Sequence, residues 1–225
     1  MQQPPGFDSG DKSLVCRLNK AIYGLKQASR QWFQHLKQIV LQLCFVDSKC
    51  DPSLFIYKDN NNIVYVLIYV DDIIITGSCV SLVQHFISQL HSNFSLKQLG
   101  KLDYFLGIEV KSLLDGYLVL TQSKYIRDLV QKTKMVKAQS VSSPMTAHYK
   151  LSKHGAYHFH DPSLYRSVVS AIQYVTVTCP ELSYVVNKVC QFMATLLDSH
   201  WVAVKRILQY LKGFISHGLH IQGSM

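Results

Sequence analysis

Two adjacent carboxylates interrupt an apolar segment of the sequence. Asp71 and Asp72 follow the eight apolar residues 63–70 and precede the isoleucines at 73–75. Neighbouring like charges repel, and burying them without a partner is costly. A fold accepts such a pair at an exposed turn, or where a divalent cation offsets the charge. Carboxylate oxygens suit Mg²⁺ or Mn²⁺, so the pair is a candidate metal site.

Both carboxylates can reach one site only if the backbone turns at this point. Neighbouring side chains of a strand point to opposite faces of its sheet. We therefore expect a tight turn at Asp71 and Asp72, held by the apolar strands on either side. A plain hairpin with an acidic turn accounts for the pair equally well when the motif is taken alone, because Asp is common in turns.

The periodicity of apolar residues predicts the elements around this turn. Strands are expected at residues 14–18, 54–57, 63–70, 73–76, 104–111 and 117–121. Helices are expected at residues 26–43, 81–91, 122–133, 162–178, 181–195 and 199–213. Residues 140–161 have no periodicity and indicate a surface linker. The expected strands thus lie mostly before residue 121 and the expected helices mostly after it, which indicates an α+β fold.

Composition indicates a folded, basic, intracellular protein. Hydrophobic residues make up 48% of the chain and charged residues 16%, which excludes a disordered tail. The net charge of +9 favours a polyanionic partner, with nucleic acid first and an anionic membrane surface second. No apolar run is long enough to span a membrane, and no signal peptide opens the chain. Six cysteines without C-x-x-C spacing indicate reduced thiols, so we expect a cytoplasmic or nuclear protein.

Other candidate sites have weaker support. His154, His158 and His160 lie close together, but no cysteine or fourth ligand stands at zinc-site spacing, which favours an exposed loop. The aromatic residues Trp32 and Tyr174 fall on apolar helix faces. Such positions favour packing in a core over stacking on nucleobases.

Several motifs in a fixed order resemble those of copia-type LTR-retrotransposon reverse transcriptases. The stretch Tyr69-Val70-Asp71-Asp72, with its apolar flanks, is similar to their catalytic hairpin. Residues 18–32 resemble the segment that marks the copia-type subgroup. Further similar segments follow in the family's order at residues 50–55, 104–109, 120–125 and 184–189. Each segment alone is weakly specific, whereas the ordered set covers nearly the whole chain and identifies the family.

The resemblance implies part of a right-hand polymerase. Residues 1–121 would form partial fingers and a palm sheet with packed helices, including the hairpin at Asp71 and Asp72. Residues 122–225 would form a helical thumb and connection region. Family members continue into an RNase H domain, and the acidic cluster of that domain is absent from this sequence.

The resemblance also implies RNA-directed DNA synthesis by two-metal nucleotidyl transfer. Asp71 and Asp72 fall on two palm carboxylates and would bind Mg²⁺ or Mn²⁺. The implied partners are an RNA or DNA template with its primer and a dNTP, with no membrane. Contacts to the primer end or to the nucleotide are implied for Tyr69, Lys26, Gln27 and Arg30. The primer grip is implied at Phe105, Leu106 and Gly107.

The family's palm uses a third carboxylate, on a strand upstream of the segment that matches residues 3–7. None of the acids before Tyr69 has the setting of that residue; they are Asp8, Asp11, Asp47, Asp51 and Asp59. We therefore expect the isolated chain to be inactive as a polymerase. The alternative is a non-catalytic retrotransposon remnant that at most binds nucleic acid through its basic charge.

Overall fold

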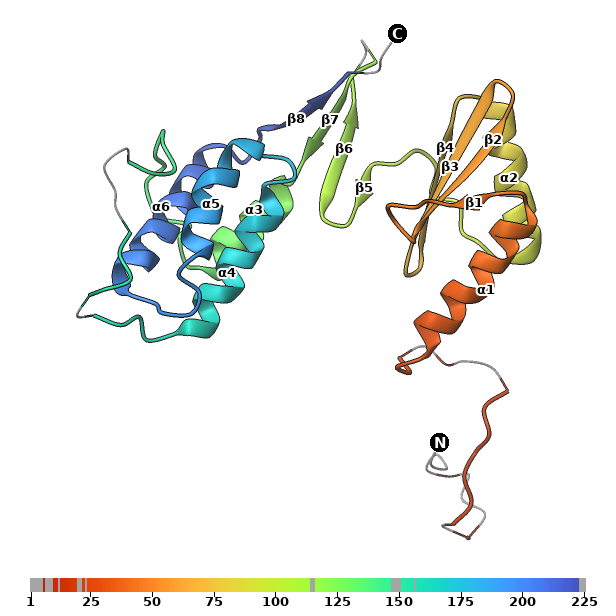
Figure 1. Cartoon of the computed structure of the whole chain (residues 1–225), viewed down its shortest axis with the longest axis horizontal. Coiled ribbons are helices and arrows are strands. Elements are labelled where there is room, and N and C mark those ends of the chain that lie inside the picture. The colour runs from red at the N-terminus through yellow and green to blue at the C-terminus, as the bar shows by residue number, and fades with distance from the viewer. Residues whose placement is uncertain are drawn as a thin grey trace. The chain divides into compact units, whose positions relative to one another are not determined.

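The chain forms two compact units, Met1–Gly100 and Lys101–Met225 (Figure 1). The computed structural model describes residues 6, 10–11, 13–19, 22, 24–113, 116–146, 151–155 and 157–222. Each unit has its own four-stranded antiparallel sheet and its own hydrophobic core. The mixed α+β fold predicted from the sequence is confirmed.

The first unit is an antiparallel sheet with two helices packed on one face. Its strands lie in the order β1-β2-β3-β4. In chain order its elements are α1 (Ala28–Gln42), β1 (Val46–Asp47), β2 (Leu54–Asp59), β3 (Asn62–Tyr69), β4 (Asp72–Gly77) and α2 (Val80–Asn93). Both helices lie on the same side of the sheet, as Figure 1 shows.

Alternation of side chains in β3 determines which face of this sheet is buried. Val64, Val66 and Ile68 are at most 1% exposed, whereas Tyr65 and Tyr69 on the opposite face are 38% and 47% exposed. The buried side chains share one core with residues of β2, α1 and α2. Burying an aliphatic side chain of this size contributes about 1.5–3 kcal/mol, so a one-residue slip of register would be strongly unfavourable.

The second unit combines a sheet of order β5-β6-β7-β8 with a helical body. Its first elements are β5 (Tyr104–Phe105), β6 (Ile108–Ser112), β7 (Leu118–Thr121), α3 (Ser123–Lys132) and α4 (Pro162–Val175). The remaining ones are the 3₁₀-helix η1 (Pro180–Leu182), α5 (Ser183–Cys190), α6 (Asp198–Gly213) and β8 (Gly218–Ile221). Residues of all four α-helices contribute to the core, including the fully buried Ile126, Ile172 and Ile207.

The start of α6 depends on a buried histidine. His200 is fully buried, and its Nδ1 accepts a hydrogen bond from the backbone N–H of Leu197 at 3.2 Å. Its Nε2 lies 2.9 Å from the carbonyl oxygen of Ser152 and donates to it in the neutral tautomer. One side chain therefore caps the helix and ties down part of the segment that the sequence indicates as a surface linker.

Several features of the fold differ from the sequence-based expectations. The helix expected at residues 181–195 is divided into η1 and α5 and ends at Cys190. Residues 14–18 contain no strand, and the strands β1 and β8 were not expected. The strand expected at residues 104–111 is divided into β5 and β6 by a turn at Leu106 and Gly107. Both turn residues have left-handed backbone, with φ of 49° and 83°. Apolar pattern alone does not reveal such a turn, because Leu106 continues the apolar run.

One further expectation concerns the identity of the two units. The palm and thumb identities and their boundary at residue 121 stay predictions. Among the described helices, none is both long and apolar enough to cross a membrane.

The substitution Leu36→Ala tests the core of the first unit. Leu36 on α1 is fully buried, so its truncation leaves a cavity and lowers the free energy of unfolding by about 2–5 kcal/mol. Native-state hydrogen exchange of the β3 amides measures the change. The matched variant Leu41→Ala removes a side chain of the same helix that is 39% exposed, and it changes stability by about 0.5 kcal/mol or less. Equal losses in the two variants would contradict this assignment of the core.

Candidate functional site

Asp71 and Asp72 lie at the tip of the hairpin formed by β3 and β4. The register pairs Tyr69 with Asp72, so Val70 and Asp71 form a two-residue turn. Both carboxylates are exposed, and neither forms a hydrogen bond or an ion pair with another described residue. The predicted tight turn is therefore present one residue earlier than expected, and its carboxylate oxygens are available to a ligand.

Val70 carries the backbone strain of this turn. Its φ is 52°, in the left-handed region that β-branched residues rarely adopt. Two-residue hairpin turns of the primed types need a positive φ at their first central residue, which is usually Gly, Asn or Asp. A residue with a Cβ in this conformation costs about 1–2 kcal/mol, so surrounding contacts must hold the turn.

Trp32 of α1 supplies such a contact. Its indole Nε1–H donates a hydrogen bond to the carbonyl oxygen of Val70 at 3.1 Å. The indole ring also packs edge-on against Phe94, with ring centroids 5.1 Å apart. Because Phe94 is the C-terminal cap of α2, both helices of the unit contribute to fixing the turn.

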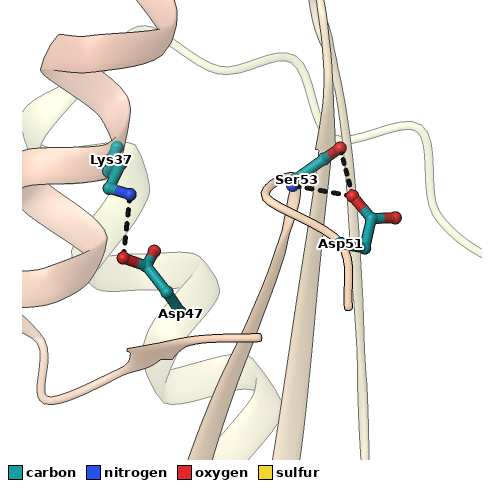
Figure 2. Close-up of polar contacts among 4 residues, drawn as sticks. All are labelled: Lys37, Asp47, Asp51 and Ser53. Carbon is teal, nitrogen blue, oxygen red and sulfur yellow. Dashed lines mark hydrogen bonds and ion pairs between the residues drawn. The ribbon is translucent and has the colours of Figure 1, made fainter. Parts of the chain in front are cut away.

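The start of β2 fixes the end of β3 from the other side. The Asp51 carboxylate accepts hydrogen bonds from the backbone N–H of Ser53 at 2.8 Å and from its hydroxyl at 2.7 Å (Figure 2). The Ser53 hydroxyl, with the backbone N–H in second place, lowers the pKa of Asp51. The carbonyl of Ser53 in turn accepts from Ile68 N–H at 2.9 Å, one residue before Tyr69. The segment at residues 50–55 thus sets the register that leads into the turn.

The remaining acids of the first unit lie elsewhere or have other partners. Asp47 forms an ion pair with Lys37 at 2.8 Å (Figure 2). Asp11 accepts hydrogen bonds from the backbone N–H and hydroxyl of its neighbour Ser13, which lower its pKa. Asp59 pairs with Asn62 at the far end of β3, about 23 Å from Tyr69 at the usual rise per residue.

A third ligand is not placed beside the pair in the described part of the chain. No group of three or more His, Cys, Asp or Glu side chains there could hold a metal ion. Asp8 lies outside the described residues. Asp71 and Asp72 therefore form a two-carboxylate site within the described residues.

The residues implied in nucleotide binding lie at the start of α1. Gln27 is the N-terminal cap of the helix, and its side chain makes no capping hydrogen bond. Lys26 and Gln27 line one surface depression, whereas Arg30 lines a second one with Phe33 and Gln34. Five residues of helix, about 7.5 Å, separate Gln27 from Trp32. The structure thus puts Arg30 on the helix that contacts the hairpin turn and Lys26 and Gln27 just before it, but not in one pocket.

The residues implied in the primer grip belong to the second unit. Phe105 ends β5, and Leu106 and Gly107 form the turn into β6. The hydroxyl of Tyr174 on α4 donates a hydrogen bond to the carbonyl of Leu106. These residues therefore form a hairpin of their own, in a different compact unit from Asp71 and Asp72.

Two positioning side chains were assigned to the core from the sequence. Trp32 and Tyr174 each donate a hydrogen bond to the carbonyl of a turn residue. Their residue types could have indicated these hydrogen bonds, because a Trp N–H or a Tyr O–H that is removed from water usually has an acceptor. The acceptors themselves, Val70 and Leu106, could not be read from the sequence because both contacts are long-range.

Comparison with known proteins matches most of the chain to one family. The profile described as reverse transcriptase (RNA-dependent DNA polymerase) matches residues 1–147. The chain is 45% identical over 223 residues, or 99% of its length, to the retrovirus-related Pol polyprotein from transposon RE2 of Arabidopsis thaliana. It is 34% identical over 239 aligned residues to the corresponding polyprotein from transposon TNT 1-94 of Nicotiana tabacum. It spans 15% and 18% of the length of these two relatives.

A shorter relative is also similar. An uncharacterized mitochondrial protein of Arabidopsis thaliana is 43% identical over 157 residues, which cover 70% of this chain and 65% of that protein. No solved structure matches the chain significantly.

The substitution Trp32→Phe removes the indole donor while keeping an aromatic ring against Phe94. We expect faster hydrogen exchange at the β3–β4 turn, by a factor that corresponds to about 0.5–1.5 kcal/mol for one lost hydrogen bond. Hydrogen-exchange mass spectrometry of the peptide that spans the turn measures it. The matched variant His35→Ala removes another ring that contacts Phe94 but makes no hydrogen bond to the turn. If the two variants have the same effect, packing and not the indole N–H holds the turn.

The substitution Val70→Gly tests the strain at the turn. Gly adopts positive φ without the steric penalty of a Cβ. After the entropic cost of Gly is subtracted, the free energy of unfolding of the variant is expected to be about 0.5–1 kcal/mol higher than that of the wild-type chain. Chemical denaturation measures the difference, with Val46→Gly in the exposed strand β1 as the control that destabilises. A destabilised Val70→Gly variant would show that Val70 is not strained.

Proposed function

Because the chain belongs to the reverse transcriptase (RNA-dependent DNA polymerase) family and is homologous to copia-type Pol polyproteins, we propose that it is the part of such a polymerase that carries two metal-binding palm carboxylates. Asp71 and Asp72 are these carboxylates, and the activity they serve is RNA-directed DNA synthesis. One observation carries the proposal: the pair is exposed and unpartnered among the described residues, at a two-residue turn that contacts from both helices hold in place.

The donor set of the turn fits a hard divalent cation. Carboxylate oxygens are the ligands that Mg²⁺ and Mn²⁺ prefer, and both carboxylates of the turn are exposed. When bound, a pair of such ions supplies the charge that stabilises the attacking and leaving oxygens in nucleotidyl transfer. Asp71 and Asp72 would hold these ions, and the fixed turn keeps both carboxylates in position without reorganisation during the reaction.

Other residues would orient the substrates around this centre. The 3′ oxygen of the primer forms a bond to the α-phosphorus of the nucleotide, the bond to pyrophosphate breaks, and the hydroxyl proton passes to solvent. Tyr69, whose ring is 47% exposed beside the turn, would lie against the primer end. Lys26, Gln27 and Arg30 would meet phosphate oxygens of the nucleotide or template. Support comes from their exposure at the N-terminus of α1, the positive end of a helix dipole.

The isolated chain is proposed to be inactive as a polymerase, because a third carboxylate completes the site in the family. In that state it binds an RNA or DNA primer–template through its charge of +9 and at most acts as a nucleic-acid-binding remnant. Such binding is electrostatic, so its affinity falls steeply with salt.

Primer extension on an RNA template tests the proposal. We expect no extension by this chain with Mg²⁺ or Mn²⁺, and extension by a version that carries the preceding palm segment of a copia-type relative at its N-terminus. In the extended version Asp71→Asn and Asp72→Asn each reduce the rate on the order of a thousandfold or more, because each removes a metal ligand. The measurement is single-nucleotide incorporation resolved by gel electrophoresis.

Asp59→Asn is the matched control for these variants. It makes the same chemical change at the end of β2, which pairs with the end of β3 that is far from the turn, and is expected to leave the rate of the extended version unchanged. Extension by the 225-residue chain itself, abolished by Asp71→Asn, would refute the proposed inactivity. An extended version that remains active after both substitutions would refute the assignment of the carboxylates.

A further inference from the structure

Two tyrosines from different helices hold the tip of the β5–β6 hairpin. Tyr174 of α4 donates its hydroxyl to the carbonyl of Leu106, the first residue of the turn. The ring of Tyr125 on α3 packs edge-on against the Tyr174 ring, with centroids 5.3 Å apart. A Cβ added to Gly107 would lie 3.7 Å from an atom of each ring, so both rings line the turn at contact distance.

The base of the same hairpin is anchored separately. Glu109 of β6 accepts a hydrogen bond from the backbone N–H of Lys124 at 2.9 Å and one from the Thr121 hydroxyl at 3.4 Å. Lys124 is in the first turn of α3, where a carboxylate is favoured by the helix dipole. The hairpin is therefore fixed to the helical body at its tip and at its base.

These contacts hold the backbone of the tip, whereas the side chains of Leu106 and Tyr104 stay exposed. Leu106 is 40% exposed and Tyr104, at the start of β5, is 50% exposed. Leu106 also has a left-handed φ of 49°, a strained conformation for a residue with a Cβ. Burial of apolar surface does not explain why the strained turn is kept, because the side chains of Leu106 and Tyr104 are exposed. A held backbone with outward side chains is suited to contacting a partner in one fixed position.

We propose that Tyr174 is a positioning residue of the primer grip, because its hydroxyl fixes the Leu106 carbonyl and thereby the tip that contacts the primer strand. The inference rests on the proposed function and on the resemblance to the family, which implies that the turn at Phe105, Leu106 and Gly107 holds the primer. Tyr174 acts through the backbone of the tip and does not touch the primer itself.

The matched pair Tyr174→Phe and Tyr125→Phe tests this role in the 225-residue chain. Each variant removes one hydroxyl and keeps its ring, but the Tyr125 hydroxyl has no hydrogen-bond partner among the described residues. The readout is the ratio of affinities for a labelled primer–template with a recessed 3′ end and for a blunt duplex of the same length, measured at one low salt concentration. A general loss of folding or of charge changes both affinities and leaves their ratio unmoved.

We expect the wild-type chain to prefer the recessed end, and Tyr174→Phe to lower this preference about two- to tenfold, the factor that corresponds to one neutral hydrogen bond. Tyr125→Phe leaves the preference unchanged. Hydrogen exchange of the peptide that contains Gly107 and Ile108 rises in Tyr174→Phe only. An unchanged preference in Tyr174→Phe, or an equal loss in both variants, overturns the proposal.

A second variant acts on the same tip and keeps the tyrosine hydroxyl. Gly107→Ala strains the backbone at a φ of 83° without a steric clash, since its Cβ would be at ordinary contact distance. It is expected to lower the preference for the recessed end as Tyr174→Phe does, and an unchanged preference would contradict the role of the tip.

A wild-type chain without any preference for the recessed end also overturns the inference. That result leaves the assignment of Asp71 and Asp72 standing, because primer extension by the extended version tests it independently.

Discussion

Two neighbouring negative charges can be kept in one fixed place only if water or a cation surrounds them. Two unit charges about 4 Å apart repel by about 1 kcal/mol in water but by about 4 kcal/mol at the effective dielectric constant of a protein surface. The hairpin resolves this constraint by placing Asp71 in the turn and Asp72 at the first position of β4, where both carboxylates are exposed. Val70 has the strained backbone conformation of the tight turn. Contacts from other elements of the first unit hold that turn.

The supports of the turn come from segments far apart in the chain. Trp32 contacts it from α1, Phe94 packs on the indole from the end of α2, and Ser53 fixes the register of β3 from the start of β2. All three depend on the common core beneath the sheet. The same principle recurs in the second unit, where Tyr174 holds a strained turn through its carbonyl. In both hairpins a buried core fixes the backbone of a turn, and side chains at or beside the turn are exposed.

The sequence was sufficient to predict what depends on local pattern. Apolar periodicity predicted the helices α1 to α4 and α6 and the strands β2 to β4 and β7. The ordered motifs predicted the family. The sequence was not sufficient to predict long-range contacts or the backbone conformation of turns. The turn at Leu106 continues an apolar run, so its left-handed backbone left no compositional signal. Trp32 packs against the core as predicted, but its hydrogen bond was not predicted because the acceptor, the carbonyl of Val70, is 38 residues away. The strand β8 was missed because four residues paired with β7 have no periodicity of their own.

The central claim is that Asp71 and Asp72 form a divalent-cation site, and paramagnetic broadening by Mn²⁺ tests it directly. In a titration of the isotope-labelled chain, the backbone amide signals of Asp71 and Asp72 and the indole N–H signal of Trp32 should broaden first, because these groups lie at the turn. In Asp71→Asn the broadening at these signals should require a higher Mn²⁺ concentration, whereas in Asp59→Asn it should not. Broadening centred on Asp47 or Asp51, or unaffected by Asp71→Asn, would contradict the account.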